Sequence, residues 1–228
     1  MTNNNTFSDA EKLAVYRAIW QRRDVRRFRS EPIEDEILQR ILQAAAHAPS
    51  VGYMQPWIFL LIRDGKIRGQ IHDAFVVANN EAKEMFEDER KAEYAALKLE
   101  GITESSLNIV VTCDRSRFGK VILGRTCQPD MDLYSSVCAV QNLWLAARAE
   151  NVGVGWVSII KPQDLQSILQ LPENVVPIAY LCVGYTDSFA SEPELKTSGW
   201  LPEIPLADLV FYEKWGQLAR DLNDASSK

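Results

Sequence analysis

Histidine is scarce in this chain, with only two among 228 residues. The four cysteines form no Cys-x-x-Cys pair, and no His-Glu-x-x-His pattern occurs. The sequence therefore predicts no built-in metal site, and the shortage of histidine argues against a Ser-His-Asp hydrolase. Three cysteines, Cys113, Cys138 and Cys182, lie in apolar segments and are predicted to be reduced core thiols.

Basic residues are also in the minority, with 25 Lys and Arg against 31 Asp and Glu, a net charge of −6. A nucleic-acid binder usually has a basic domain or stripe, so we expect no nucleic-acid partner. No apolar run approaches the roughly 18 residues of a membrane span. The first residues have neither the charged nor the apolar region of a signal peptide, so we expect a cytoplasmic protein with no membrane partner.

What is present is an ordinary globular composition, 46% hydrophobic and 25% charged. The spacing of apolar residues along the chain predicts an α+β fold. Helices are predicted at 9–22, 37–45, 67–98, 133–149 and 162–169, and strands at 57–62, 107–113, 156–160 and 176–183. The 133–149 helix is apolar nearly all round, as a central or dimer-interface helix would be. No linker divides the chain, so 1–228 is predicted as one domain with a C-terminal arm from about 186 to 228.

The first candidate site is the sequence RRDVRR at 22–27, which follows a predicted helix. Arginine presents a rigid fork of donors that matches phosphate oxygens. Four arginines in six residues stand out in an acidic chain. The alternative is a solvated basic patch at a helix C-terminus, where cations suit the helix dipole.

Two further clusters lie in predicted loops. The sequence PSVGYMQPW at 49–57 could set backbone groups and Gln55 against a planar ligand, or could simply pack its aromatic residues in a turn. The sequence NVGVGWVS at 151–158 begins with a predicted Gly-rich turn, whose glycines would let a ligand approach the backbone. It follows a helix and lacks the remainder of the dinucleotide fingerprint, so it does not predict a Rossmann site.

Taken in order, the three clusters resemble the flavin-contacting segments of the nitroreductase superfamily. Within it, the chain resembles the 5,6-dimethylbenzimidazole synthase subfamily, in PSVGYMQPW, LKLEGI at 97–102 and GVGWVS at 153–158. MDLY at 131–134 and CAVQNLW at 138–144 also fit. Two positions depart from the ordinary nitroreductase pattern: Asp24 stands where Ser or Thr is usual, and Tyr53 where Asn is usual.

The resemblance implies a nitroreductase-like fold, with a mostly antiparallel central sheet flanked by helices in an intertwined homodimer. It implies that reduced FMN is the substrate, fragmented with O2 to 5,6-dimethylbenzimidazole and erythrose 4-phosphate for the lower ligand of cobalamin. It implies no metal, and a separate NAD(P)H:flavin reductase as partner. The alternatives are an NAD(P)H-dependent FMN nitroreductase or flavin reductase and a non-catalytic flavin-storage protein.

The resemblance also assigns roles to residues. Asp24 and Ser158 would be catalytic, Asp24 moving protons and Ser158 hydrogen-bonding the flavin. Residues 81–102 would form a lid over it, which excludes water and a nicotinamide. The expected flavin contacts are Arg22, Arg23, Asp24, Val25, Arg26, Ser50, Met54, Gln55, Met85, Leu97, Lys98, Leu99, Gly155 and Ser158.

Overall fold

The computed structural model describes residues 6–217. The chain divides into two compact units, the first ending at Ser191 and the second beginning at Glu192. The single domain expected from the sequence, with its lid and arm, stays a prediction, and residues 218–228 of that arm lie outside the described residues. In the part of the chain that is described, no helix is long and apolar enough to cross a membrane.

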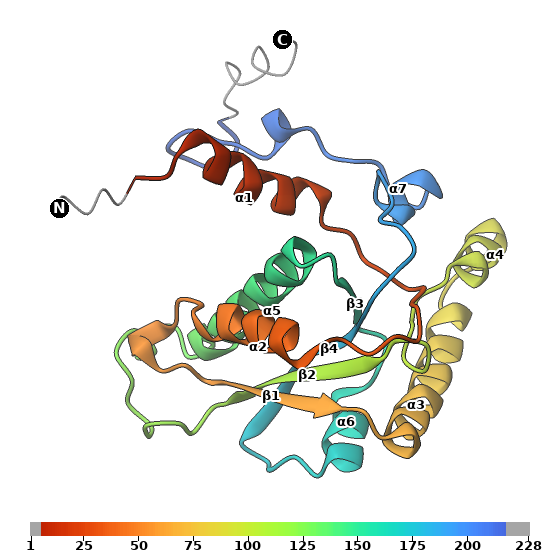
Figure 1. Ribbon diagram of the computed structural model, residues 1–228, viewed down its shortest axis with the longest axis horizontal. Coiled ribbons are helices and arrows are strands. Elements are labelled where there is room, and N and C mark those ends of the chain that lie inside the picture. The colour runs from red at the N-terminus through yellow and green to blue at the C-terminus, as the bar shows by residue number, and fades with distance from the viewer. Residues whose placement is uncertain (1–5, 218–228) are drawn as a thin grey trace. The chain divides into compact units, whose positions relative to one another are not determined.

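A four-stranded antiparallel sheet forms the centre of the first unit, in the order β1-β2-β4-β3. Its strands are β1 (Trp57–Ile62), β2 (Leu107–Asp114), β3 (Gly153–Val157) and β4 (Val175–Gly184). Helices connect consecutive strands, and together they give the α+β architecture that the sequence predicts (Figure 1).

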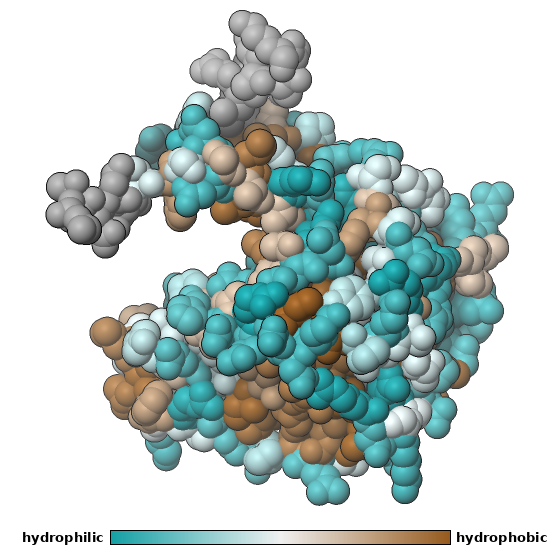
Figure 2. Space-filling model, viewed as in Figure 1, coloured by the Kyte–Doolittle hydropathy of each residue, from teal (hydrophilic) through white to brown (hydrophobic). Residues whose placement is uncertain are grey.

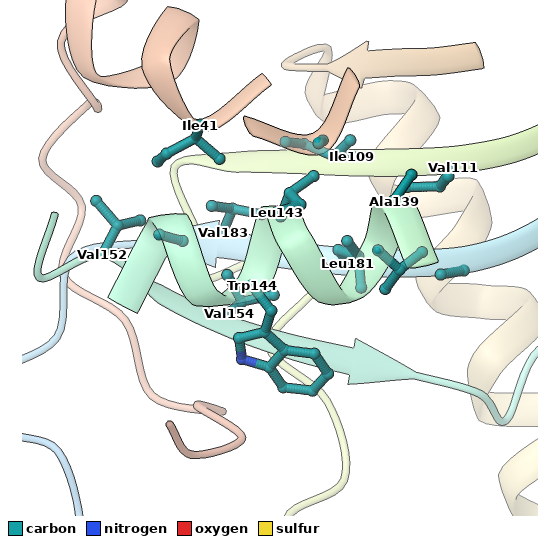
Figure 3. Close-up of a cluster of buried hydrophobic side chains, with 14 of the residues drawn as sticks. Ile41, Ile109, Val111, Ala139, Leu143, Trp144, Val152, Val154, Leu181 and Val183 are labelled. Atoms are coloured by element: carbon teal, nitrogen blue, oxygen red, sulfur yellow. The ribbon is translucent and has the colours of Figure 1, made fainter. Parts of the chain in front are cut away.

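Helices cover both faces of this sheet. Strand β2 is buried on both sides, and its alternate residues point to opposite faces of the sheet. Ile109 and Val111 of β2 pack with α2 (Asp35–Ala46) and α5 (Met131–Ala149), as Figure 3 shows for α5. Val110, between them, packs in a second cluster with α3 (Gly65–Glu84) and α6 (Pro162–Leu169).

The first helix, α1 (Asp9–Gln21), begins at a capping box in which Ser8 and Glu11 exchange hydrogen bonds, as the sequence pattern indicates. None of its residues is buried. Its apolar side chains, including Tyr16, Ile19 and Trp20, are exposed. The helix therefore presents an apolar surface that the described residues of the first unit leave uncovered.

Two predicted elements were wrong. The predicted helix at 67–98 is interrupted: after α3 ends at Glu84, α4 runs from Asp88 to Ala96. Phe86 stacks on Tyr94 at 4.9 Å, so aromatic packing at the break overrides the continuous helical pattern. The predicted turn at 151–155 and strand at 156–160 are instead one strand that begins at Gly153, because β3 pairs along β4 from Gly184.

The remaining elements are short. A 3₁₀ turn, η1, spans Val51–Tyr53 in the first unit. The second unit contains α7 (Glu194–Thr197) and the 3₁₀ turn η2 (Leu206–Asp208). All four cysteines are free; Cys113 and Cys182 are buried as predicted, whereas Cys138 is only partly buried.

Candidate functional site

The arginine segment at 22–27 lies against β3, which brings together two of the three clusters found in the sequence. Asp24 forms a parallel bridge with Val154, and the Val25 N–H donates to the Val154 carbonyl at 3.0 Å. The Trp156 N–H donates to Oδ1 of Asp24 at 3.1 Å. Backbone pairing therefore sets the position of the segment, and the Asp24 side chain adds a second link.

The glycines of β3 make this pairing possible. A Cβ at Gly155 would lie 2.1 Å from the Val25 carbonyl oxygen, and one at Gly153 would lie 3.0 Å from a Val25 methyl carbon. From the sequence, we expect these glycines to let a ligand approach the backbone. The group that approaches both of them is instead Val25 of the same chain. The role of Gly155 as a flavin contact stays a prediction.

The arginines of the segment are held in different ways. The guanidinium carbon of Arg22 lies 4.7 Å from the centre of the Trp144 ring. The guanidinium of Arg23 donates to three main-chain carbonyls, those of Trp20, Arg22 and Ser191. Arg26 lies 4.0 Å from Oδ1 of Asp24, whose side chain is 36% exposed. Arg22 and Asp24 thus keep hydrogen-bonding capacity for a ligand, whereas Arg23 is largely occupied.

A further arginine, Arg148, fixes the end of α1 that leads into this segment. It donates from Nε to the Gln21 carbonyl at 3.1 Å and from Nη2 to Gln21 Oε1 at 3.3 Å. Burial lowers the pKa of Arg148, and the charges of Arg17 and Arg23 lower it further. The sequence analysis missed this residue, because a basic residue in the last turn of a helix is common and carries no signal of its own.

The third cluster, residues 50–57, forms a tight loop with an unusual backbone. Gly52, Tyr53 and Gln55 all have left-handed φ values, of 52°, 54° and 46°. Such conformations cost free energy for residues other than glycine and persist where neighbouring contacts impose them. Here the Gln55 N–H donates to Ser50 Oγ at 3.0 Å, and Arg117 donates to the Gln55 carbonyl. Ser50 therefore positions Gln55 through its hydroxyl oxygen.

The 50–57 loop contacts an ionic cluster centred on a buried aspartate. Asp132 is fully buried, and its Oδ2 lies 3.1 Å from both Arg115 Nε and Arg125 Nη2. Arg125 also lies 3.9 Å from the sulfur of Met54, which is buried. Burial alone would lower the pKa of Arg115, but the hydrogen bonds and charges of its aspartates raise it. No role was assigned to these charges from the sequence, since only the fold brings them together.

The predicted lid spans the end of α3, α4 and residues 97–102. Tyr94 of α4 donates to Asn79 of α3 at 2.8 Å, so α4 folds back on α3. Met85 is 79% exposed, whereas Leu99 packs against the second core cluster. Leu97 is partly buried at the end of α4, and Lys98 pairs with Glu104 at 2.6 Å.

The far end of this segment reaches the arginine segment. A Cβ at Gly101 would lie 2.6 Å from the Phe28 ring and 3.1 Å from the Arg26 carbonyl oxygen. Residues 97–102 therefore lie next to the candidate site.

The structure thus joins some predicted residues and separates others. Hydrogen bonds connect residues 22–26 with β3, and Ser158 directly follows that strand and is exposed. The bonds described for the 50–57 loop lie within the loop or run to Arg117 and Arg125. Among residues 6–217, no three His, Cys, Asp or Glu side chains gather as metal ligands would.

Comparison with known proteins decides the family. The sequence model described as "Nitroreductase family" matches residues 19–185, which include all three clusters. The chain belongs to the nitroreductase family. It is 44% identical over 184 residues to the curated 5,6-dimethylbenzimidazole synthase of Rhodospirillum rubrum, covering 81% of this chain and 87% of that protein.

Other members of the nitroreductase family are more distant. A 5,6-dimethylbenzimidazole synthase of Rhodobacter capsulatus is 33% identical over 199 residues, covering 87% of this chain and 96% of that protein. A putative NADH dehydrogenase/NAD(P)H nitroreductase of Archaeoglobus fulgidus is 27% identical over 171 residues, covering 73% and 82%.

Solved structures confirm the fold. An iodotyrosine deiodinase bound to FMN and 3-iodo-L-tyrosine superimposes with a TM-score of 0.71 at 22% identity, covering 88% of this chain and 100% of that one. At this identity the likeness establishes the nitroreductase fold alone.

Proposed function

We propose that this member of the nitroreductase family is a 5,6-dimethylbenzimidazole synthase, which fragments reduced FMN with O2 to yield 5,6-dimethylbenzimidazole and erythrose 4-phosphate for cobalamin. The observation that carries the proposal is the 44% identity to a curated synthase across most of both chains. The carboxylate at Asp24, held at the Trp156 N–H of β3, supports it. We expect this chemistry in the cytoplasm, as the sequence predicts.

The residues of the site fit FMN. Among the described residues, the Arg22 guanidinium makes no hydrogen bond or ion pair, so its donors are available to a phosphate. Arg26 supplies a second cation at the same segment. Arg23 uses three of its five N–H groups on main-chain carbonyls, so we assign it mainly to holding the segment. Reduced FMN, when bound, supplies the electrons that O2 accepts.

The two proposed catalytic residues are both connected to the end of β3. Oδ1 of Asp24 accepts the Trp156 N–H, which leaves Oδ2 to accept or donate a proton at the substrate. Ser158 follows Trp156 by two residues, roughly 7 Å along an extended chain. We propose that the Asp24 carboxylate, bonded at Trp156, and the Ser158 hydroxyl engage two atoms of one ring system.

We propose roles for the other predicted contacts as well. Val25 and Gly155 form the floor where the segment crosses β3. Ser50, Met54 and Gln55 belong to a loop bonded to Arg117 and not to β3, so we assign the contacts of this loop to the flavin of a second protomer, with the buried Met54 side chain supporting the loop. Met85, Leu97, Lys98 and Leu99 belong to the lid, which we propose excludes water and nicotinamide, so that a separate flavin reductase supplies reduced FMN.

The decisive experiment follows the fate of reduced FMN. Photoreduced FMN is mixed with the protein, air is admitted, and 5,6-dimethylbenzimidazole is assayed by chromatography. We expect product above a protein-free control. Rapid NAD(P)H oxidation without product would favour the nitroreductase alternative, and tight FMN binding without flavin loss would favour storage.

Asp24→Asn tests the proton role. An asparagine keeps an oxygen that can accept the Trp156 N–H, so the segment should stay on β3. We expect the variant to bind FMN within about threefold of wild type and to form product at least ~100-fold more slowly. Unchanged product formation in the variant would show that Asp24 does not transfer a proton in the reaction.

The proposed homodimer has a separate test. Apolar side chains are exposed on α1 and on the loops near residues 53 and 118–123, and Figure 2 shows the loop group as hydrophobic surface at its left edge. We expect a dimer in sedimentation equilibrium, and Ile19→Asp to weaken it at least tenfold, since it places a charge on α1. A wild-type monomer at micromolar concentration would contradict this assignment.

A further inference from the structure

Trp144 of α5 has two features that its place in the core does not explain. It is 93% buried, yet no described residue accepts a hydrogen bond from its indole N–H. An unpaired buried donor is unfavourable, and a phenylalanine at this position would lack it. Figure 3 shows the indole at the margin of the cluster, extending beyond the aliphatic side chains of α5.

The second feature is the partner of its ring face. The Arg22 guanidinium carbon lies 4.7 Å from the ring centre, within the range of a cation–π interaction. Indole binds cations more strongly through its face than the ring of phenylalanine does. Tryptophan at position 144 therefore leaves a donor unpaired, but it also holds Arg22 more strongly than phenylalanine would.

Holding a guanidinium by its face has a consequence for binding. The N–H groups of arginine lie in the plane of the group, so a contact through the face leaves them for other acceptors. Arg23 provides the contrast within the same segment, since three of its five N–H groups are bound to main-chain carbonyls. Arg22 is thus oriented in advance without losing its donors, which lowers the cost of binding an anion.

We propose that Trp144 is a positioning residue that orients Arg22 toward the phosphate of FMN and so makes the site select phosphorylated flavin over riboflavin. The inference rests on the flavin binding in the proposed function. It adds a residue outside the three sequence clusters and a reason for selectivity. Trp144 itself touches neither the phosphate nor the reacting atoms.

The test compares two probes, FMN and riboflavin, titrated into the full-length protein and followed by flavin fluorescence. We expect Trp144→Phe to weaken FMN binding about three- to tenfold, and Trp144→Leu to weaken it further. Riboflavin binding should change less than twofold in both variants. Leu143→Val, a neighbouring core change on α5, is the matched control and should leave the FMN-to-riboflavin ratio unchanged.

A double-mutant cycle measures the coupling between Arg22 and Trp144. Arg22→Lys keeps the charge but loses the planar fork of donors. The fold loss of FMN affinity in the double variant should therefore be smaller than the product of the fold losses in Arg22→Lys and Trp144→Leu. Equal losses for FMN and riboflavin, or fully independent effects in the cycle, would overturn the inference. Failure of the proposed function would be recognised separately, in a wild-type protein that leaves reduced FMN intact in air.

Discussion

The crossing of the arginine segment over β3 makes Gly155→Ala the most informative single change to stability. A Cβ there would lie 2.1 Å from the Val25 carbonyl oxygen, whereas real Cβ contacts stay beyond 3.0 Å. The contact is with main chain, so no side-chain rotation relieves it. The segment must move by about 0.9 Å or more, which would stretch the Val25-to-Val154 hydrogen bond, now 3.0 Å, beyond hydrogen-bonding range.

The magnitude follows from the interactions that this shift breaks. Two hydrogen bonds, at Val25 and at Asp24, contribute about 1 kcal/mol each. Displacing Val25, which is buried, costs roughly 1.5–3 kcal/mol more. Replacing a strand glycine by alanine returns roughly 0.5–1 kcal/mol through backbone entropy. We expect the free energy of unfolding to fall by about 2.5–4.5 kcal/mol and FMN affinity to fall at least ~10-fold.

Gly153→Ala is the matched control, because it lies on the same strand and faces the same residue. Its Cβ would meet side-chain atoms of Val25 at 3.0–3.1 Å, which small shifts can relieve. We expect a loss of about 1 kcal/mol or less. Urea denaturation followed by circular dichroism, together with FMN titration, measures both variants. A Gly155→Ala protein that matches wild type in stability and in FMN affinity would refute the reasoning.

The remaining prediction concerns the ionic cluster beneath the 50–57 loop. Asp132→Asn should lower the free energy of unfolding by about 3–5 kcal/mol, because it leaves Arg115 and Arg125 facing a buried neutral group. Urea denaturation measures the loss, and Asp130→Asn, whose carboxylate is 57% exposed and also pairs with Arg115, is the control and should cost less than about 1 kcal/mol. Equal losses in the two variants would show that burial does not govern this cluster.

Local patterns predicted most of the elements. The strand at Trp57–Ile62 is an uninterrupted apolar run, and α6 begins at Pro162, so both match their predicted bounds. β3 was misplaced because its glycines carry the signal of a turn, and only pairing with β4 reveals them as a strand. The predicted helix at 67–98 was too long because the stacking of Phe86 on Tyr94 is invisible to periodicity.

By itself, the sequence determined the family and predicted the chemical character of the candidate site, because a run of arginines around Asp24 and the motif at 49–57 are local features. The tertiary structure decided which groups those residues meet. It brought Asp24 to the Trp156 N–H, Val25 to Gly155 and Arg22 to Trp144, contacts between residues more than a hundred positions apart. Such contacts depend on how the arginine segment crosses β3 and α5, and no local pattern encodes that crossing.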